Sequence, residues 1–494
     1  MYEKFLTNQA IIRNWQTLYL LAIFLSFRLL SFALAGETLV QAVLVFIFIL
    51  IFGVIYYKNQ TAAWYIILGE LLLGGAGHFF EFFGLSLRTL LFISFILLWT
   101  IQTIASGQNP LNQFPRRLYS LLAGFGGFVV LSVFLGLTNQ HGLKAVVSDF
   151  IPYAYFLLVF PAYHILQKKS GQAYLVRLLT VFLIGSALFA LYTFIVFSVN
   201  LEFLQSPYYK WFRDIALGKI TDFGGGFWRV VVPEHLLVAP LTVLIASLLM
   251  RREKHHPLWY ALLLPALLIL ALNLSRAYLL GLVGGILLLK LRHGLKRWAL
   301  VGGGTILLFI ALFSSINLIS SGGQTAGLDI LGVRLGGLTR PATETSATLR
   351  AALLNPIFKM IGQHPWLGSG LGSRLIFIHP KDGRQFISQH FDWGYLEMWV
   401  ELGLAGTLAY LILIGAIALA LIKKIRSAPD YIDFYVGLLG GLAALLIINV
   451  TTPALFHVLG VFYLVFVLTI AAKDETILDN ITYLLYQTFH RLKS

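Results

Sequence analysis

Long apolar runs, separated by short polar loops, cover almost the whole chain. A helix needs about 20 mainly apolar residues to cross the hydrocarbon core of a bilayer, and it satisfies its own backbone polar groups. We therefore predict an all-α, polytopic membrane protein, in which residues 1–494 form one domain with about 14 transmembrane helices (range about 12–14). The predicted spans begin near Leu18, Val40, Ala62, Thr89, Leu118, Phe150, Tyr174, His235, Leu258, Ser275, Trp298, Gly394, Phe434 and Pro453.

Basic residues cluster in the short loops on one side of this arrangement. Lys and Arg are retained on the cytoplasmic side of membranes, so the clusters predict that both termini are cytoplasmic. The last segment, 474–494, carries apolar residues along one face of a predicted helix, which is typical of an amphipathic helix on the membrane surface. The basic clusters are Lys58, Arg116 and Arg117, Lys168 and Lys169, Arg251 and Arg252 with Lys254, Arg292 with Lys296 and Arg297, and Lys423 and Lys424 with Arg426.

Two longer polar segments, 200–234 and 317–393, then lie outside the cytoplasm. Long loops are translocated whatever their charge, so the arginines inside them agree with this orientation. Loops of this length in a compact protein are usually functional or disordered. In the second loop, apolar residues at helical spacing from Ser346 to Ile361 predict a helix with a kink at Pro356.

Composition supports a membrane protein and excludes several kinds of site. Of the 494 residues, 58% are hydrophobic and only 12% are charged, and the mean hydropathy is +0.82. The formal net charge of +15 is explained by the basic cytoplasmic loops, so we expect no nucleic-acid partner. The chain has no cysteine, which excludes disulfides, thiolate metal sites and cysteine nucleophiles. No spaced His/carboxylate triad occurs, so we expect neither a metal nor a cofactor.

Three arginines on the non-cytoplasmic side are candidates for binding an anion. Arg276 opens the tenth predicted span, Arg350 lies beside the apolar stripe of the loop helix, and Arg229 follows the glycines of "GGGFWR". The planar guanidinium fork suits phosphate or carboxylate, and an arginine near a membrane needs a partner or water. The ordinary alternatives are a snorkelling side chain for Arg276, a solvated helix charge for Arg350 and a flexible loop around Arg229. Arg28 and Glu70 fall inside predicted spans, where we expect structural pairing.

His390 and Asp392 stand where the second loop meets the twelfth predicted span, and Tyr395, Glu397 and Glu401 follow on its first turns. A histidine or carboxylate at a membrane interface can accept a proton from an attacking hydroxyl, which makes His390 and Asp392 candidate catalytic residues. Asp392 could instead cap the helix, a favourable role for aspartate near an N-terminus. Glu397 and Glu401 are four residues apart, so they share a helix face and repel unless they are solvated or paired.

Several of these pieces follow one another in a recognisable order. Ser275 and Arg276 open a span, Arg350 precedes "HPWLGSGLG" at 364–372 by fourteen residues, and "DWGYLEMWVELGLAG" follows at 392–406. In this order and spacing the motifs resemble those of the O-antigen ligase and polymerase superfamily of bacterial envelope glycosyltransferases. The part of the resemblance that carries motifs covers about 227–406.

The resemblance implies the fold of the C-type membrane glycosyltransferases. It also implies transfer of a glycan from an undecaprenyl-diphosphate carrier to an acceptor sugar hydroxyl, at the outer face of the bacterial cytoplasmic membrane. Arginines would hold the diphosphate without a metal, because cationic groups stabilise the charge that develops on it. On this basis Arg276, Arg350 and Arg229, together with Tyr395 and Glu397, are assigned to substrate binding. Membrane lipid, and a flippase and a chain-length regulator of the same pathway, are the expected partners.

One departure from the family pattern leaves the base open between His390 and Asp392. Ligase-like members often have His-Asn four and three residues before the leucine of "YL", where this chain has Asp392 and Trp393. Aspartate at this position resembles the polysaccharide polymerases, which favours a polymerase over a ligase that transfers glycan to lipid A core. The competing class is a lipid-linked oligosaccharide flippase or a small-solute transporter. Concentration of polar residues in one external loop favours the enzyme.

Overall fold

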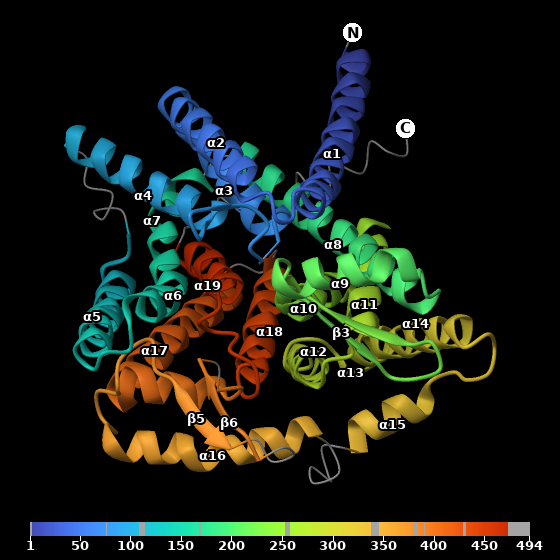
Figure 1. The fold of residues 1–494 in the computed structure, drawn as a ribbon. Helices are drawn as coiled ribbons and strands as arrows, with labels where there is room; N and C mark the ends of the chain where they lie inside the picture. The colour runs from blue at the N-terminus through green and yellow to red at the C-terminus, as the bar shows by residue number, and fades with distance from the viewer. Residues whose placement is uncertain are drawn as a thin grey trace.

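The computed structural model describes residues 2–75, 77–107, 114–166, 169–251, 257–336, 345–378, 383–389, 391–427 and 431–472. Helices dominate these segments (Figure 1). Short 3-10 helices join α6 to α7 and lead into α10, and a π-helix joins α13 to α14. The α-helices are α1 (Tyr2–Ala33), α2 (Thr38–Lys58), α3 (Gln60–Leu73), α4 (Leu87–Ala105), α5 (Arg116–Thr138), α6 (Leu143–Ala154), α7 (Val159–Ile165), α8 (Lys169–Ser198), α9 (Glu202–Asp214), α10 (Val238–Leu249), α11 (Pro257–Asn273), α12 (Arg276–Leu289), α13 (Leu295–Trp298), α14 (Gly304–Ser320), α15 (Leu328–Gly336), α16 (Thr345–Gln363), α17 (Gly394–Ser427), α18 (Ile432–Ile448) and α19 (Val458–Ala471).

Every predicted span coincides with one of these helices or with a consecutive pair of them. Within the described residues, eight helical segments are long and apolar enough to cross a membrane. The remaining predicted spans correspond to shorter apolar helices of 10–17 residues. The chain is therefore a predominantly helical, multi-pass membrane protein. The number of complete crossings and the side on which the termini lie stay predictions, and the amphipathic tail at 474–494 lies outside the described residues.

Both predicted external loops are ordered where the structure describes them. The first contains α9 and an antiparallel hairpin of β3 (Lys219–Asp222) and β4 (Trp228–Val231). The second contains α15, the predicted helix (now α16, with Pro356 inside it) and a hairpin of β5 (Leu375–Ile378) and β6 (Gln385–Ser388). A third hairpin joins β1 (Glu81–Phe82) to β2 (Leu85–Ser86). The sequence predicted none of these hairpins, because strands of two to four residues are too short to show a period.

Helices α10, α12 and α18 pack against one another at the centre of the molecule (Figure 1). Glycines set the spacing between α12 and α18. A Cβ added to Gly285 would lie 2.8 Å from the carbonyl oxygen of Gly440, and one added to Gly281 would lie 2.9 Å from that of Ala444. Small residues let transmembrane helices approach closely enough for van der Waals packing to hold them together. The Gly281-to-Gly285 spacing of four residues therefore defines this central contact.

Two buried ion pairs involve the N-terminal helices, one joining α1 to the segment before α10 and the other joining α3 to α4. Arg28 on α1 donates to Glu234 at 2.9 Å, and Arg88 on α4 donates to Glu70 on α3 at 3.1 Å. The Arg28 guanidinium also lies 3.6 Å from the ring centroid of Phe24. Arg28 and Glu70 are thus both paired, as expected for charges inside apolar helices, although not with each other. Removing one partner of such a pair leaves an uncompensated buried charge and is strongly destabilising.

Candidate functional site

The helix α17 is broken at Gly403, where the backbone has φ +70° and ψ 176°. A break leaves carbonyl groups without partners on one side and N–H groups without partners on the other. The glycine-rich segment 364–373 supplies both kinds of partner. Ser369 N donates to Val400 O at 2.7 Å and Gly370 N to Glu401 O at 3.2 Å, while Leu404 N donates to Pro365 O at 2.9 Å. The motif "HPWLGSGLG" therefore completes the hydrogen bonding of a discontinuous helix.

Glycine is required in this segment because the backbones touch. A Cβ at Gly403 would lie 2.3 Å from Trp366 O, and one at Gly368 would lie 2.5 Å from Glu401 O. A Cβ at Gly370 would lie 2.1 Å from Gly136 N on α5. Gly368, Gly370 and Gly403 all have positive φ angles, which residues with a side chain rarely adopt. These glycines thus hold α5, the loop and both halves of α17 together.

Three carboxyl groups lie behind this loop. Asp149 on α6 accepts a hydrogen bond from Gly372 N at 3.0 Å and shares a side-chain hydrogen bond with the buried Glu401. Two carboxyl groups can share a hydrogen bond only when one of them carries the proton. Glu397, also buried, accepts from Phe391 N at 3.1 Å. Glu401, through Asp149, therefore supports the glycine-rich segment 364–373, and Glu397 fixes the backbone just before α17.

Asp392 is held between two well-packed neighbours. Phe391 is fully buried in a small cluster with residues of α16 and β5, and the indole of Trp393 donates to Arg350 O at 3.0 Å. The backbone of Asp392 has φ +56°, a left-handed conformation that aspartate tolerates better than most residues. Its side chain is half-buried. The fold thus presents this carboxylate at one defined place beside α16.

The geometry argues against helix capping by Asp392. The helix begins at Gly394, and the carbonyl of Trp393 accepts its first hydrogen bond, from Glu397 N at 2.8 Å. The capping position is therefore Trp393. Among the described residues, the Asp392 carboxylate has no hydrogen-bond partner. His390, the other candidate base, lies outside the described residues.

The hydroxyl of Tyr395 has a hydrogen-bond partner within the protein. Its hydroxyl donates to Leu446 O on α18 at 2.8 Å, which ties the first turn of α17 to that helix. The hydrogen bond from Phe391 N to Glu397 is likewise a contact within the protein. Tyr395 and Glu397 therefore both have structural roles. Substrate binding by Tyr395 and Glu397 stays a prediction.

The three predicted arginines come from three elements. Arg229 on β4 pairs across the hairpin with Thr221, and its Nε donates to the carbonyl oxygen of Asn273 at 2.6 Å. Arg276 is the first residue of α12, three positions after Asn273. Arg350 lies on α16, and its buried Nε has no hydrogen-bond partner in the part of the chain that the structure describes. All three side chains are half-buried.

Burial and the charges of other arginines act on Arg229. Burial is the largest influence and, together with the positive charges of Arg334, Arg276 and Arg350, lowers the pKa of Arg229 to about 10. Tyr278 acts in the opposite direction, less strongly than Arg334 but more strongly than Arg276 or Arg350. None of the groups that shift this pKa most is a carboxylate. Since a pKa of about 10 still leaves Arg229 protonated at neutral pH, the arrangement concentrates positive charge and suits a polyanion.

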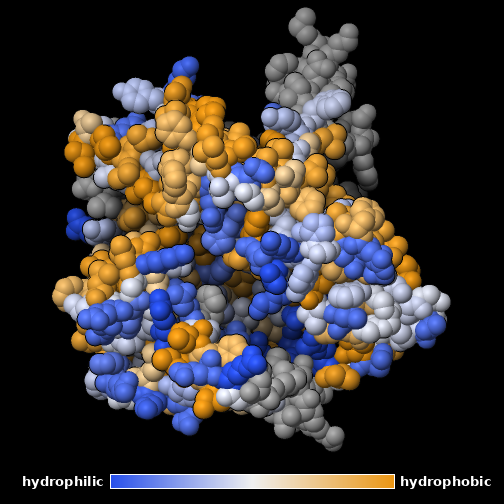
Figure 2. Space-filling model, in the orientation of Figure 1, coloured by the Kyte–Doolittle hydropathy of each residue, from blue (hydrophilic) through white to orange (hydrophobic). Residues whose placement is uncertain are grey.

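Polar side chains also gather on the surface around a recess. Figure 2 shows hydrophilic residues around a hollow in the middle of the displayed face, in the region where Figure 1 draws α12, α18 and the β5–β6 hairpin. Arg276 begins α12, and Asp392 follows β6 in the chain. The polar recess therefore lies in the region of elements near which the chain carries candidate site residues.

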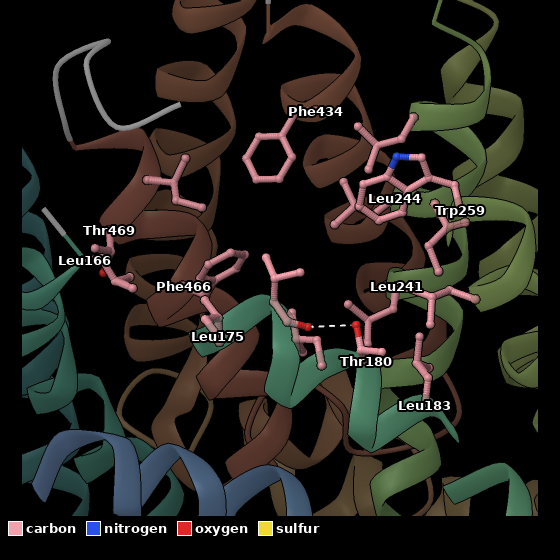
Figure 3. A pocket seen from close by; sticks show the side chains of 16 residues that line it. Leu166, Leu175, Thr180, Leu183, Leu241, Leu244, Trp259, Phe434, Phe466 and Thr469 are labelled. Carbon is pink, nitrogen blue, oxygen red and sulfur yellow. Dashed lines mark hydrogen bonds between the residues drawn. The ribbon is translucent and has the colours of Figure 1, made fainter. Parts of the chain in front are cut away.

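A separate apolar cavity of about 850 Å³, which includes space open to the outside, lies among α8, α10, α11, α18 and α19. Figure 3 shows Trp259, Phe434 and Phe466 around it, with Thr180 and Thr469 as its polar side chains. No charged side chain and none of the predicted site residues line it. Its chemistry does not suit a diphosphate, so the arginine-bearing region is the better candidate for a phosphate site.

Residues 261–411 match the family model described as O-antigen ligase. The match confirms that this segment resembles the O-antigen ligase and polymerase superfamily. The matched segment includes Arg276, Arg350, Asp392 and the glycine motif, whereas Arg229 precedes it. No curated protein matches the chain in sequence. The superfamily supports glycan transfer of the ligase or polymerase type in general and does not distinguish the two.

Sequence reasoning missed Arg334 and Asp149. Arg334 lies in the second predicted loop without a motif around it, so nothing in the sequence separated it from an ordinary loop charge. Asp149 directly precedes the predicted span at Phe150, on the same side of the membrane as the glycine loop. A carboxylate at that end of a span was a signal, but its pairing with Glu401 depends on how α6 meets α17.

We predict that Gly403→Ala lowers the thermal unfolding midpoint of the purified protein in detergent. The substitution imposes a strained backbone angle and a 2.3 Å contact with Trp366 O, and strain of this kind costs about 1–3 kcal/mol. Gly362→Ala on α16 is the matched control, because a Cβ there has no atom within 4 Å. Equal midpoints for the two variants would show that the break in α17 does not need glycine.

Proposed function

We propose that the chain belongs to the O-antigen ligase and polymerase superfamily and that it is a polysaccharide polymerase of the bacterial cytoplasmic membrane. It would transfer a glycan from an undecaprenyl-diphosphate carrier to an acceptor sugar hydroxyl at the outer face, without a metal. The observation that carries the proposal is the hydrogen bond from Arg229 Nε to Asn273 O, three residues before Arg276 at the start of α12. Guanidinium groups that come from separate elements and lie near the ends of apolar helices suit a polyanionic ligand.

The donor side of the site would act by electrostatics. As the glycosidic bond to the carrier breaks, negative charge develops on the diphosphate, and fixed guanidinium groups stabilise it. Arginine suits this task because it presents paired donors to phosphate oxygens and stays charged when half-buried. The unpartnered Nε of Arg350 is a donor available for such a contact. A lipid carrier also explains why these groups lie at the ends of apolar helices.

The acceptor side would use a base at the start of α17. The acceptor hydroxyl oxygen bonds to the anomeric carbon of the donor glycan, the bond from that carbon to the diphosphate oxygen breaks, and the hydroxyl proton passes to the base. Asp392 is the base that the geometry favours, since its carboxylate is half-buried and the fold fixes its backbone. The indole of the adjacent Trp393 donates to the backbone oxygen of Arg350, which ties the segment that carries Asp392 to α16. His390 remains the alternative.

Aspartate at position 392 also supports the choice of polymerase, because ligase-like members often have histidine there. The alternative is a ligase that transfers glycan to lipid A core or to another acceptor. A polymerase would work beside a flippase and a chain-length regulator of the same pathway. A lipid-linked oligosaccharide flippase is a second alternative, and it differs from an enzyme in forming no new glycosidic bond.

The direct test is synthesis by purified protein in detergent. Given undecaprenyl-diphosphate-linked repeat units and EDTA, the protein should extend them into longer glycans, which gel electrophoresis or mass spectrometry would detect. Lipid A core supplied as the only acceptor separates a ligase from a polymerase. Activity that disappears in EDTA and returns with a divalent ion would overturn the metal-independent proposal. Movement of the donor across liposomes without any new bond would indicate a flippase.

We predict that Asp392→Asn reduces turnover by about 10²–10⁴-fold while donor binding is retained. Asparagine also tolerates the left-handed backbone, so the fold should survive and only the proton acceptor is lost. Asp214→Asn on α9, where the carboxylate is 45% exposed, is the matched control. Full turnover in Asp392→Asn would exclude this carboxylate and move the assignment to His390.

We predict that Arg350→Gln weakens binding of a prenyl diphosphate by about tenfold or more, the usual contribution of a charge-assisted hydrogen bond. The same change removes one repelling charge, so the thermal midpoint of the free protein should stay equal or rise. Arg213→Gln on α9 is the control, because that side chain is 56% exposed and pairs with Asp214. A lower midpoint with unchanged binding would identify Arg350 as a structural residue.

A further inference from the structure

A fourth arginine, Arg334, approaches the same region from α15. Its guanidinium carbon lies 4.3 Å from the ring centroid of Phe223, in the turn between β3 and β4. Arginine stacks well on aromatic faces, and the contact holds the planar group in a defined position while its N–H donors remain at the edge. The side chain of Arg334 is half-buried.

Several contacts fix the position of the Phe223 ring that Arg334 touches. Its backbone N–H donates to Phe227 O at 3.0 Å, and Gly224 N donates to the side chain of Asp222 at 2.8 Å, so the turn is closed from both sides. The ring of Phe223 stacks on Phe227 with centroids 6.2 Å apart. Phe227 is fully buried and packs edge-on against Phe313 of α14 at 5.3 Å. The position of the Phe223 ring is thus tied to the helical core.

The same hairpin carries Arg229, two residues after Phe227 on β4. Of the neighbouring charges that act on Arg229, that of Arg334 has the largest influence, ahead of those of Arg276 and Arg350. The stacking of Arg334 on the turn of this hairpin thus brings a second guanidinium group toward the strand that carries Arg229. Two guanidinium groups from separate elements can together contact a ligand that carries several negative charges.

We propose that Arg334 is a further phosphate-binding residue of the donor site and that Phe223 is its positioning residue. The ligand class is a prenyl diphosphate, and the inference rests on the proposed function. The contact also connects two parts of the chain: Arg334 lies inside the segment that matches the family, whereas Phe223 and Arg229 precede it. The hairpin therefore contributes to a site that the matched segment alone does not complete.

The alternative to phosphate binding by Arg334 is a structural role at the end of α15. It lies in the last turn of α15, where a positive charge stabilises the helix dipole. Arg334→Lys keeps that charge but replaces the planar fork by a compact ammonium, whereas Arg334→Gln removes it. If Arg334 only stabilises the helix dipole, Arg334→Gln should lower the thermal unfolding midpoint and Arg334→Lys should not. Neither variant should then change ligand binding.

The test is calorimetric titration of the full-length protein in detergent with farnesyl diphosphate, and with uncharged farnesol as the control ligand. We expect Arg334→Gln to weaken diphosphate binding by about tenfold or more and Arg334→Lys to weaken it less. Phe223→Leu should weaken it in the same direction, whereas Phe223→Tyr, which keeps the ring, should bind like the wild type. Farnesol binding and the thermal midpoint should change little in these variants.

The outcomes distinguish this inference from the function on which it rests. If Arg350→Gln loses diphosphate binding and Arg334→Gln does not, Arg334 is outside the site and the proposed function stands. If none of the arginine variants loses binding, the diphosphate site itself is wrong. If Arg334→Gln loses binding and Phe223→Leu does not, the positioning role of Phe223 is overturned. The exposed Arg213→Gln should behave like the wild type throughout.

Discussion

The break in α17 is the constraint on which the rest of the site depends. Backbone polar groups that lack partners inside a membrane protein cost several kcal/mol, so a helix can be interrupted only where other groups replace its lost hydrogen bonds. The segment 364–373 does this from both sides of Gly403, and it reaches α5 through Gly370. The start of α17, with Asp392 just before it, is therefore fixed by contacts made ten residues further along the helix.

The second organising feature is a concentration of like charge. Specific contacts hold three of the arginines that the proposed donor site uses. Arg229 is held by the carbonyl of Asn273, Arg334 by the ring of Phe223, and the backbone of Arg350 by the indole of Trp393. Each restraint comes from a different element. Guanidinium groups held in defined positions suit the recognition of phosphate oxygens.

The carboxylates near the start of α17 differ in their surroundings. Glu401 and Glu397 are buried and committed to the glycine loop and to Phe391 N, so they hold the scaffold. Asp392 differs from both, because it is half-buried and sits on a left-handed backbone between buried neighbours. Strained backbone of this kind persists only where the surroundings over-determine it, and such positions cluster at functional sites. One short stretch thus carries two acids with structural contacts and one, Asp392, that we propose as the base.

The sequence determined the membrane character, the position of every apolar helix and the helix of the second loop, because hydrophobic length and helical period are local properties. It also selected Arg229, Arg276, Arg350 and Asp392 as candidates. It did not indicate that Arg334 stacks on Phe223, that Asp149 pairs with Glu401, or that the glycine motif completes a broken helix. These facts depend on contacts between residues tens or hundreds of positions apart, and their energies arise only once the helices have packed. The tertiary structure therefore decided which charges meet, and the sequence decided which charges were available.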